Sequence, residues 1–171
     1  MTVFSTDRLV VSRLTGSDVT ALYGIFSNPV VMYWLADQKT YTLEETRSFV
    51  EESIANYDKY PYGCWGIKLK DESSKGVIGI AGFFPPSEVN PQPDMVIALR
   101  QDMWRKGLAR EVGQALTSYA FHHLRFDRIV STVDVGNIAS MKLVKHLGFK
   151  TIEMVRNPNT GGEMEMLELK P

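Results

Sequence analysis

The sequence predicts a single mixed α/β domain, and three observations lead to that prediction. Strand-like and helical runs follow one another along the chain in the order β-α-α-β-β-β-α-β-α-β-β. Three strands run together in the middle, which excludes a regular doubly wound fold. The chain has 171 residues, 44% of them hydrophobic, and shows no linker or repeat, so we expect one domain over residues 1–171.

The N-terminal half is predicted to hold three strands and two helices. The strands are runs rich in β-branched and aromatic residues, and the helices have apolar residues at a spacing of three and four. Strands are expected at 9–14, 62–70 and 76–84, and helices at 18–26 and 42–60. The second helix begins with a capping-box pattern from Thr42 to Glu45. Between the helices, the apolar and aromatic segment 30–35 is expected to be a short helical turn or a loop.

The C-terminal half begins after a proline-rich loop at 85–93, in which a helix is excluded. It is predicted to hold four strands and two helices, the last helix ending at a C′ glycine, Gly148. Strands are expected at 94–100, 128–135, 149–155 and 164–169, and helices at 107–124 and 138–147.

Composition narrows the function classes. The formal net charge is −1, so we expect no nucleic-acid partner and no anionic membrane partner, each of which would need a broad basic surface. No run approaches the roughly 18 apolar residues of a membrane span, and the first residues lack the apolar segment of a signal peptide. Cys64 is the only cysteine, and we expect it to be a core strand residue, the alternative being a reactive thiol. These features predict a cytoplasmic protein.

The turn from Trp104 to Glu111 is the strongest functional signal. It follows a strand-like run and opens a long helix, whose first N–H groups have no intrahelical partners. The helix dipole favours an anion at the same place, and Arg105, Lys106 and Arg110 add full positive charges. Gly107 allows a close backbone approach. The turn is neither a Walker A loop nor a dinucleotide fingerprint, but it predicts a phosphate-bearing ligand.

A second segment, from Asn137 to Phe149, places an Asn and a Ser three residues apart at the start of a helix. Read as structure alone, Asn137 is an N-cap and Ser140 lies in the first helical turn.

Together the segments resemble the GNAT superfamily of acetyl-CoA-dependent N-acetyltransferases. The closest branch looks like the ribosomal-protein-alanine N-acetyltransferases, with their spermidine- and antibiotic-acetylating relatives. The superfamily's pyrophosphate loop, Q/R-x-x-G-x-G/A, is matched at 104–109, with Trp104 in place of Gln or Arg. Its R-L-x-L-R-x-L, N-P-x-V-x-x-x-L and N-x-x-S…L-G-F motifs are matched at 8–14, 28–35 and 137–149.

This resemblance implies a twisted, mostly antiparallel central sheet of about seven strands flanked by about four helices. It implies acetyl-CoA (coenzyme A) as cosubstrate and no metal. The backbone N–H groups of the loop would bind the pyrophosphate, strand backbone near Leu99 would pair with pantetheine, and Asn137 and Ser140 would face the thioester end. The loop residues concerned are Arg105, Lys106, Gly107, Leu108, Ala109 and Arg110.

The resemblance also implies acyl transfer from a thioester to an amine, which needs a base for the ammonium and a donor for the departing thiolate. Asp94 occupies the position where this branch often has a Glu base, with Glu88 a weaker candidate; alternatively, Asp94 merely ends the proline loop. The superfamily's Tyr acid is replaced by Val144, so Ser140 is the substitute donor, unless it serves only in capping or pantetheine binding.

The acceptor is left open between a peptide N-terminus and a small-molecule amine. Tyr33, Trp34 and Phe84 could line its pocket or belong to the core, and His122, His123 and His146 are expected on helix surfaces or helix faces. A homodimer through the terminal strands is possible. The alternative function is a non-catalytic acyl-CoA-binding or sensor module.

Overall fold

The computed structural model describes residues 1–35, 38–71, 76–86 and 92–171. The strands are β1 (Thr2–Ser5), β2 (Leu9–Arg13), β3 (Cys64–Leu69), β4 (Gly79–Phe84), β5 (Asp94–Leu99), β6 (Ile129–Asp134), β7 (Lys150–Arg156) and β8 (Glu163–Leu169). The α-helices are α1 (Val19–Phe26), α2 (Pro29–Leu35), α3 (Leu43–Asn56), α4 (Leu108–His122) and α5 (Ile138–His146).

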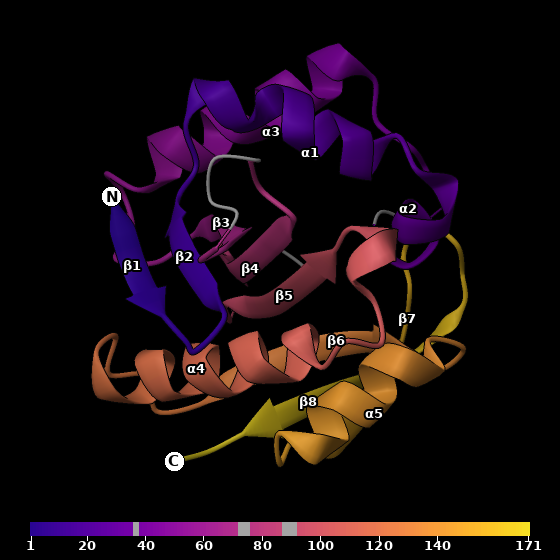
Figure 1. The fold of residues 1–171 in the computed structure, drawn as a ribbon. Coiled ribbons are helices and arrows are strands. Elements are labelled where there is room, and N and C mark those ends of the chain that lie inside the picture. The colour runs from indigo at the N-terminus through magenta and orange to yellow at the C-terminus, as the bar shows by residue number, and fades with distance from the viewer. Residues whose placement is uncertain (36–37, 72–75, 87–91) are drawn as a thin grey trace.

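The described strands form one eight-stranded sheet in the order β1-β2-β3-β4-β5-β6-β8-β7 (Figure 1). Neighbouring strands are antiparallel except for β5 and β6, which are parallel. The predicted mixed α/β class with a mostly antiparallel sheet is therefore confirmed.

Two elements go beyond the prediction of about seven strands and four helices. The four residues of β1 are too few to show an alternating pattern, yet the strand forms because the Phe4 ring packs 6.4 Å from Trp65 and 5.4 Å from Tyr119. The segment after Asn28 is a regular helix, α2, in which Pro29 takes the first position, where a missing N–H costs nothing. Asn28 Oδ1 accepts a hydrogen bond from Val30 N and fixes the start of that helix.

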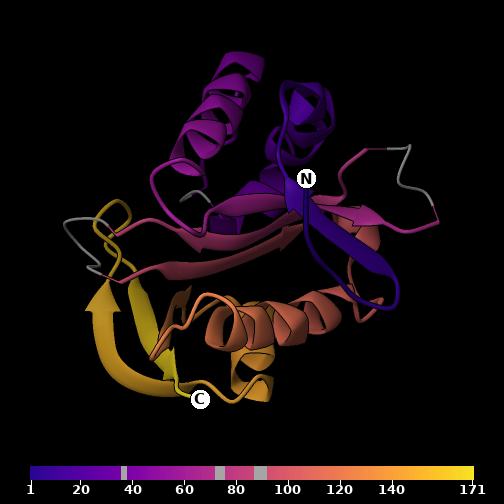
Figure 2. The ribbon, with the colours of Figure 1, turned by 90° about the vertical axis from the view of Figure 1, so that its left-hand side faces the viewer.

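The helices cover both faces of the sheet. Figures 1 and 2 show α1 and α3 on one face and α4 on the other, with α5 lying near β6 and β8. One core cluster joins α1, α2 and α3 to the sheet and includes Cys64, of which 5% is exposed. The other joins α4 and α5 to the opposite face. Burial raises the pKa of the Cys64 thiol, so the structure favours the core interpretation over a reactive one.

β5 and β6 separate soon after they begin, and the space between them is where the candidate active site lies. The two strands are paired only at Asp94 and Val130. Further along β6, the N–H of Thr132 donates to the Asp94 carboxylate (N–Oδ1 3.2 Å) instead of to the backbone of β5. The Asp94 side chain thus takes the place of the next ladder bond, and the strands diverge beyond it.

No helix in the described part of the chain is long and apolar enough to cross a membrane.

Candidate active site

A cleft with two adjoining lobes lies where β5 and β6 diverge. We call the larger one, of about 740 Å³, the basic lobe, and the smaller one, of about 530 Å³, the acidic lobe. The basic lobe extends to the turn before α4, and the acidic lobe to the turn between β7 and β8. Six residues line both lobes and form their junction: Trp34, Leu35, Ile97, Asn137, Ser140 and Leu143.

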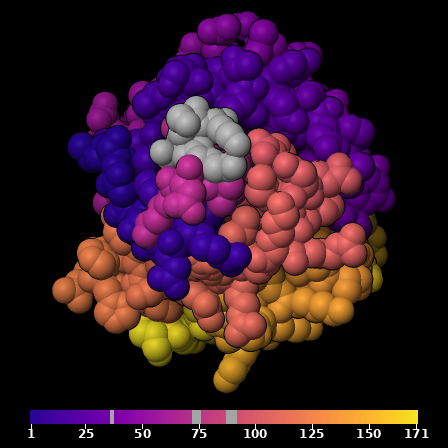
Figure 3. Space-filling model, in the orientation of Figure 1, coloured from indigo at the N-terminus to yellow at the C-terminus, as the bar shows by residue number. Residues whose placement is uncertain are grey.

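The predicted phosphate turn forms one wall of the basic lobe. Arg105 (φ 58°) and Gly107 (φ 77°) both adopt left-handed backbone, which gives the turn its tight shape before α4. The N–H groups of residues 105–110 donate to no residue that the structure describes. Five of these six residues line the lobe, which therefore has free backbone donors at a helix N-terminus, the arrangement that binds an anion. In Figure 3 the salmon-coloured turn lies at the surface between the dark-blue N-terminal residues and orange α5.

The ionisable side chains that line this lobe are all basic. Arg105 and Arg110 line it as predicted, and no acidic residue is among its described lining. Lys142 and His146 also line it from α5: Lys142 has no predicted role, and His146 is predicted only to lie on a helix surface or face. Their spacing of four puts them on one helix face, a signal that could have found them.

Five of the six predicted loop residues line the basic lobe: the two arginines and three others. Gly107, Leu108 and Ala109 contribute to its wall. Lys106 is outside both lobes: its ammonium lies 4.0 Å from Met103 Sδ, and its carbonyl accepts a hydrogen bond from Arg8.

The edge of β5 supplies a second set of backbone groups. The N–H of Arg100, directly after β5, donates to the carbonyl of Ile78, directly before β4. Backbone groups alternate between the two edges of a strand, so the even-numbered residues of β5 direct their N–H and C=O groups to β4. The odd-numbered residues Ile97 and Leu99 therefore direct their N–H and C=O groups to the other edge of β5, which faces the cleft. The Leu99 carbonyl is already occupied, because the Trp104 indole N–H donates to it at 2.8 Å. The Leu99 N–H and both backbone groups of Ile97 remain for an extended ligand.

At the junction, Asn137 caps α5 as predicted. Its Oδ1 accepts from Ser140 N at 3.1 Å, which leaves the amide NH₂ as a donor. The Ser140 hydroxyl makes no hydrogen bond with the described residues, and it lines both lobes. A hydroxyl in this position can donate to a group held at the junction.

The acidic lobe has the opposite charge. Asp94 and Asp134 line it, and no Lys, Arg or His is among its described lining. Each carboxylate accepts a hydrogen bond from a backbone N–H: Asp94 from Thr132, and Asp134 from Gly136 at 2.8 Å. These bonds fix the direction of the carboxylates, and a cation is the complementary ligand.

Aromatic side chains border the same lobe. Tyr33 and Trp34 lie on α2 with ring centroids 4.6 Å apart, and Phe84 ends β4; all three line the lobe and are exposed. Buried Val144 lies in its wall, so an apolar surface stands where the superfamily resemblance implies a Tyr acid. Glu88 lies outside the described residues.

The other titratable candidates lie away from the cleft. His122 Nδ1 lies 2.8 Å from Ser118 O on α4, and the His123 ring stacks on Tyr119 at 4.9 Å. Within the described ranges, no three His, Cys, Asp or Glu side chains gather as metal ligands.

Comparisons with known proteins point to one family. Residues 8–150 match the acetyltransferase (GNAT) domain. Over 154 residues the chain is 29% identical to the uncharacterized N-acetyltransferase YoaA of Bacillus subtilis, covering 90% of this chain and 86% of that one.

Two solved structures share the fold. One is the ribosomal L7/L12 alpha-N-protein acetyltransferase RimL in complex with coenzyme A, with a TM-score of 0.83 at 18% identity, covering 99% of this chain and 98% of that one. The other is a Salmonella typhimurium acetyltransferase that modifies the N-terminal serine of the same ribosomal protein, with a TM-score of 0.81 at 18% identity and coverage of 97% and 96%.

Proposed function

The chain belongs to the GNAT acetyltransferase family, enzymes that transfer an acetyl group from acetyl-CoA, and we propose that its acceptor is a primary amine bound in the acidic lobe. The observation that carries the proposal is the opposite charge of two adjoining lobes that share six lining residues. An anionic donor fits the lobe lined by Arg105, Arg110 and Lys142, and an ammonium fits the lobe lined by Asp94 and Asp134. The reacting groups would meet at the junction.

The residues of the basic lobe fit coenzyme A. The free N–H groups of the loop residues that line the lobe, Arg105 and 107–110, hold the pyrophosphate, and the two arginines at the ends of the loop neutralise phosphate charge. The cleft-facing N–H of Leu99 and the carbonyl of Ile97 pair with the pantetheine amides as an added strand. When bound, acetyl-CoA supplies the thioester whose acetyl group is transferred.

Three groups of the chain act on the reaction. Asp94 takes the proton from the acceptor ammonium, through a water because its side chain is short, so that the neutral amine can attack. The Ile97 N–H, at the junction, donates to the thioester oxygen as it gains negative charge. The Ser140 hydroxyl donates to the departing sulfur.

Among primary amines, the acceptor that the acidic lobe fits best is the N-terminus of a protein. Its described lining has two carboxylates, and the remaining side chains are apolar, aromatic or neutral and polar. This matches one ammonium followed by ordinary peptide groups, whereas a polyamine carries several positive charges. The fold likeness to acetyltransferases of a ribosomal-protein N-terminus supports the same class.

The first test is the thermal stability of the protein with acetyl-CoA, with NAD and ATP as controls. A ligand that binds only the folded state raises the melting temperature, and we expect a rise with acetyl-CoA alone. Turnover is then measured as free thiol release, with peptides that begin with Ala or Ser compared against spermidine and simple diamines. Preference for diamines would contradict the peptide assignment. Binding without turnover on any amine would support the acyl-CoA sensor instead.

A further inference from the structure

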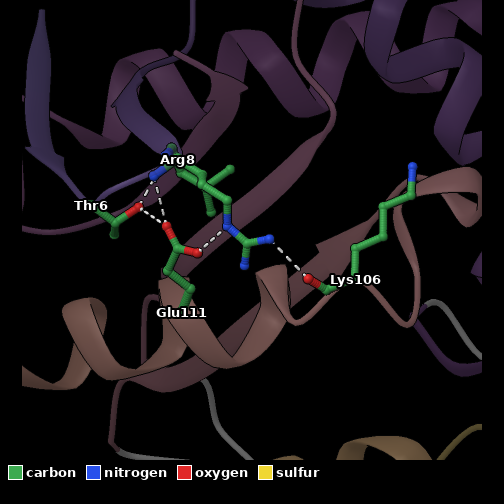
Figure 4. Close-up of polar contacts among 5 residues, drawn as sticks. Thr6, Arg8, Lys106 and Glu111 are labelled. Atoms are coloured by element: carbon green, nitrogen blue, oxygen red, sulfur yellow. Dashed lines mark hydrogen bonds and ion pairs between the residues drawn. The ribbon is translucent and has the colours of Figure 1, made fainter. Parts of the chain in front are cut away.

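A polar cluster outside the cleft ties the N-terminal strands to the phosphate turn (Figure 4). We call Thr6, Arg8, Glu111 and the Lys106 carbonyl the turn clamp. Glu111 Oε1 accepts from Thr6 Oγ1 (2.5 Å) and from Arg8 N (2.9 Å), and Glu111 Oε2 accepts from Arg8 Nε (2.6 Å). Arg8 Nη1 donates to the Lys106 carbonyl at 3.0 Å. One arginine therefore bridges the first turn of α4 and the turn before it.

The clamp is a connected network and not one exposed ion pair. The side chain of Arg8 is 51% exposed, but that of Glu111 is only 19% exposed. Partial burial acts to raise the pKa of Glu111, but hydrogen bonds from Thr6 and Arg8 outweigh it, and the pKa is lowered. The carboxylate is thus held ionised, and it holds the guanidinium in the orientation that reaches the turn.

The bond to the Lys106 carbonyl has a geometric consequence inside the basic lobe. The peptide between Lys106 and Gly107 is planar and trans, because the described chain has no cis peptide. In a trans peptide the C=O and the following N–H point in opposite directions. The Lys106 carbonyl faces Arg8, so the Gly107 N–H points away from Arg8. Gly107 lines the basic lobe, whereas Arg8 and Lys106 do not.

We propose that Arg8 is a positioning residue for phosphate binding: by holding the Lys106 carbonyl outside the cleft, it turns the Gly107 N–H toward the pyrophosphate. This inference rests on the proposed function. Arg8 is not a catalytic residue, because it lines neither lobe and acts only through the peptide. The turn has two residues in the left-handed conformation, Arg105 and Gly107, and such backbone persists where contacts from the surrounding structure stabilise it. The hydrogen bond from Arg8 is such a contact.

The test is calorimetric titration of CoA into the wild type and the variants Arg8→Gln and Arg8→Lys, with Arg47→Gln as control. Arg47 is an exposed helix arginine with a 3.8 Å ion pair to Glu44, so the control removes the same charge away from the turn. We expect Arg8→Gln to weaken CoA binding about tenfold, the effect of losing bonds to a charged donor. Arg8→Lys should recover little, because an ammonium cannot bridge both partners. The control should bind like the wild type.

Two further measurements separate positioning from charge and from folding. The affinity gap between the wild type and Arg8→Gln should persist when salt is raised from 0.1 to 0.5 M, since long-range attraction would be screened. With S-acetylpantetheine, a donor without phosphates, Arg8→Gln should keep the wild-type kcat/KM.

Unchanged CoA affinity in Arg8→Gln, full rescue by Arg8→Lys, loss of the gap at high salt, or an equal loss with S-acetylpantetheine would each overturn the inference. A wild type that binds no CoA would instead overturn the proposed function, and the inference with it.

Discussion

The basic and acidic lobes differ in how the chain builds them. The basic lobe takes its phosphate donors from one continuous stretch, residues 105–110, and residues of α2, β5 and α5 complete its lining. The acidic lobe takes its two carboxylates from separate strands, β5 and β6, and its other side chains from α2, β4, α5 and the β7–β8 turn, far apart in the sequence. A site made by local backbone can bind the same cosubstrate throughout a family, whereas a site made from many segments can change its acceptor residue by residue.

The largest effect is expected in the acidic lobe, from Asp94→Asn. Asparagine keeps an oxygen for the Thr132 N–H but cannot take a proton, so kcat should fall about 10²- to 10⁴-fold, the usual range for a general base. CoA affinity should stay at the wild-type value, because Asp94 does not line the basic lobe. Steady-state kinetics and calorimetric titration measure the two quantities separately.

Asp94→Ala is the matched variant, because it also removes the bond to Thr132 and should lower stability by ~1 kcal/mol. If Asp94→Asn acetylates at the wild-type rate, Asp94 only opens the sheet and the base lies elsewhere.

In the basic lobe, Gly107→Val should weaken CoA binding about 30-fold or more. A valine at a φ of 77° stores about 2 kcal/mol of backbone strain, which the turn relieves by moving its donors. Gly161→Val is the control: this glycine also has a positive φ (72°), but it has no neighbour within 4 Å of an added Cβ and lines neither lobe. Equal CoA affinities in both variants would argue against the pyrophosphate at residues 105–110.

At the junction, Ser140→Ala should lower kcat by up to about tenfold without weakening CoA binding, since one hydrogen bond to a good leaving group is lost. Stopped-flow measurement of thiol release checks this effect. Ser48→Ala, an exposed serine on α3, is the control and should leave kcat unchanged. A Ser140→Ala variant with weaker CoA binding and normal kcat would assign the hydroxyl to pantetheine binding instead.

A smaller effect is expected from Trp104→Phe, which keeps a ring in the basic lobe but removes the indole N–H. The Leu99 carbonyl then loses its 2.8 Å donor, and CoA affinity should fall about fivefold as the edge of β5 loosens. Titration of CoA measures the change. A tighter complex in Trp104→Phe would mean that the freed carbonyl pairs with the ligand.

The smallest effect concerns the pH dependence of the turn clamp. The folded-state pKa of Glu111 is lowered below its ordinary 4.5, so its ionised form stabilises the fold above that value. This stability is lost as the pH falls through the folded pKa. The difference in melting temperature between the wild type and Glu111→Gln should therefore be largest at pH 7 and shrink toward pH 4. A difference that grows with acidity would contradict the clamp.

By itself, the sequence determined the order of the elements and the groups that depend on local backbone. The Thr42–Glu45 capping box, the Asn137 cap and the left-handed Gly148 after α5 are all present as predicted. These features are local, because a turn or cap is set by residues within one helical turn. The strand β1 was missed since its four residues are stabilised by distant aromatic rings.

Only the tertiary structure decided the remainder of the site. It placed Lys142 and His146 on the basic lobe and Lys106 outside it, and it gave Asp134 a place beside the acidic lobe. It also joined Arg8 to a turn 98 residues away. Residue spacing can put Lys142 and His146 on one helix face, but it does not say that this face borders the cleft. That depends on where the sheet opens and which strands become neighbours, and these contacts are non-local.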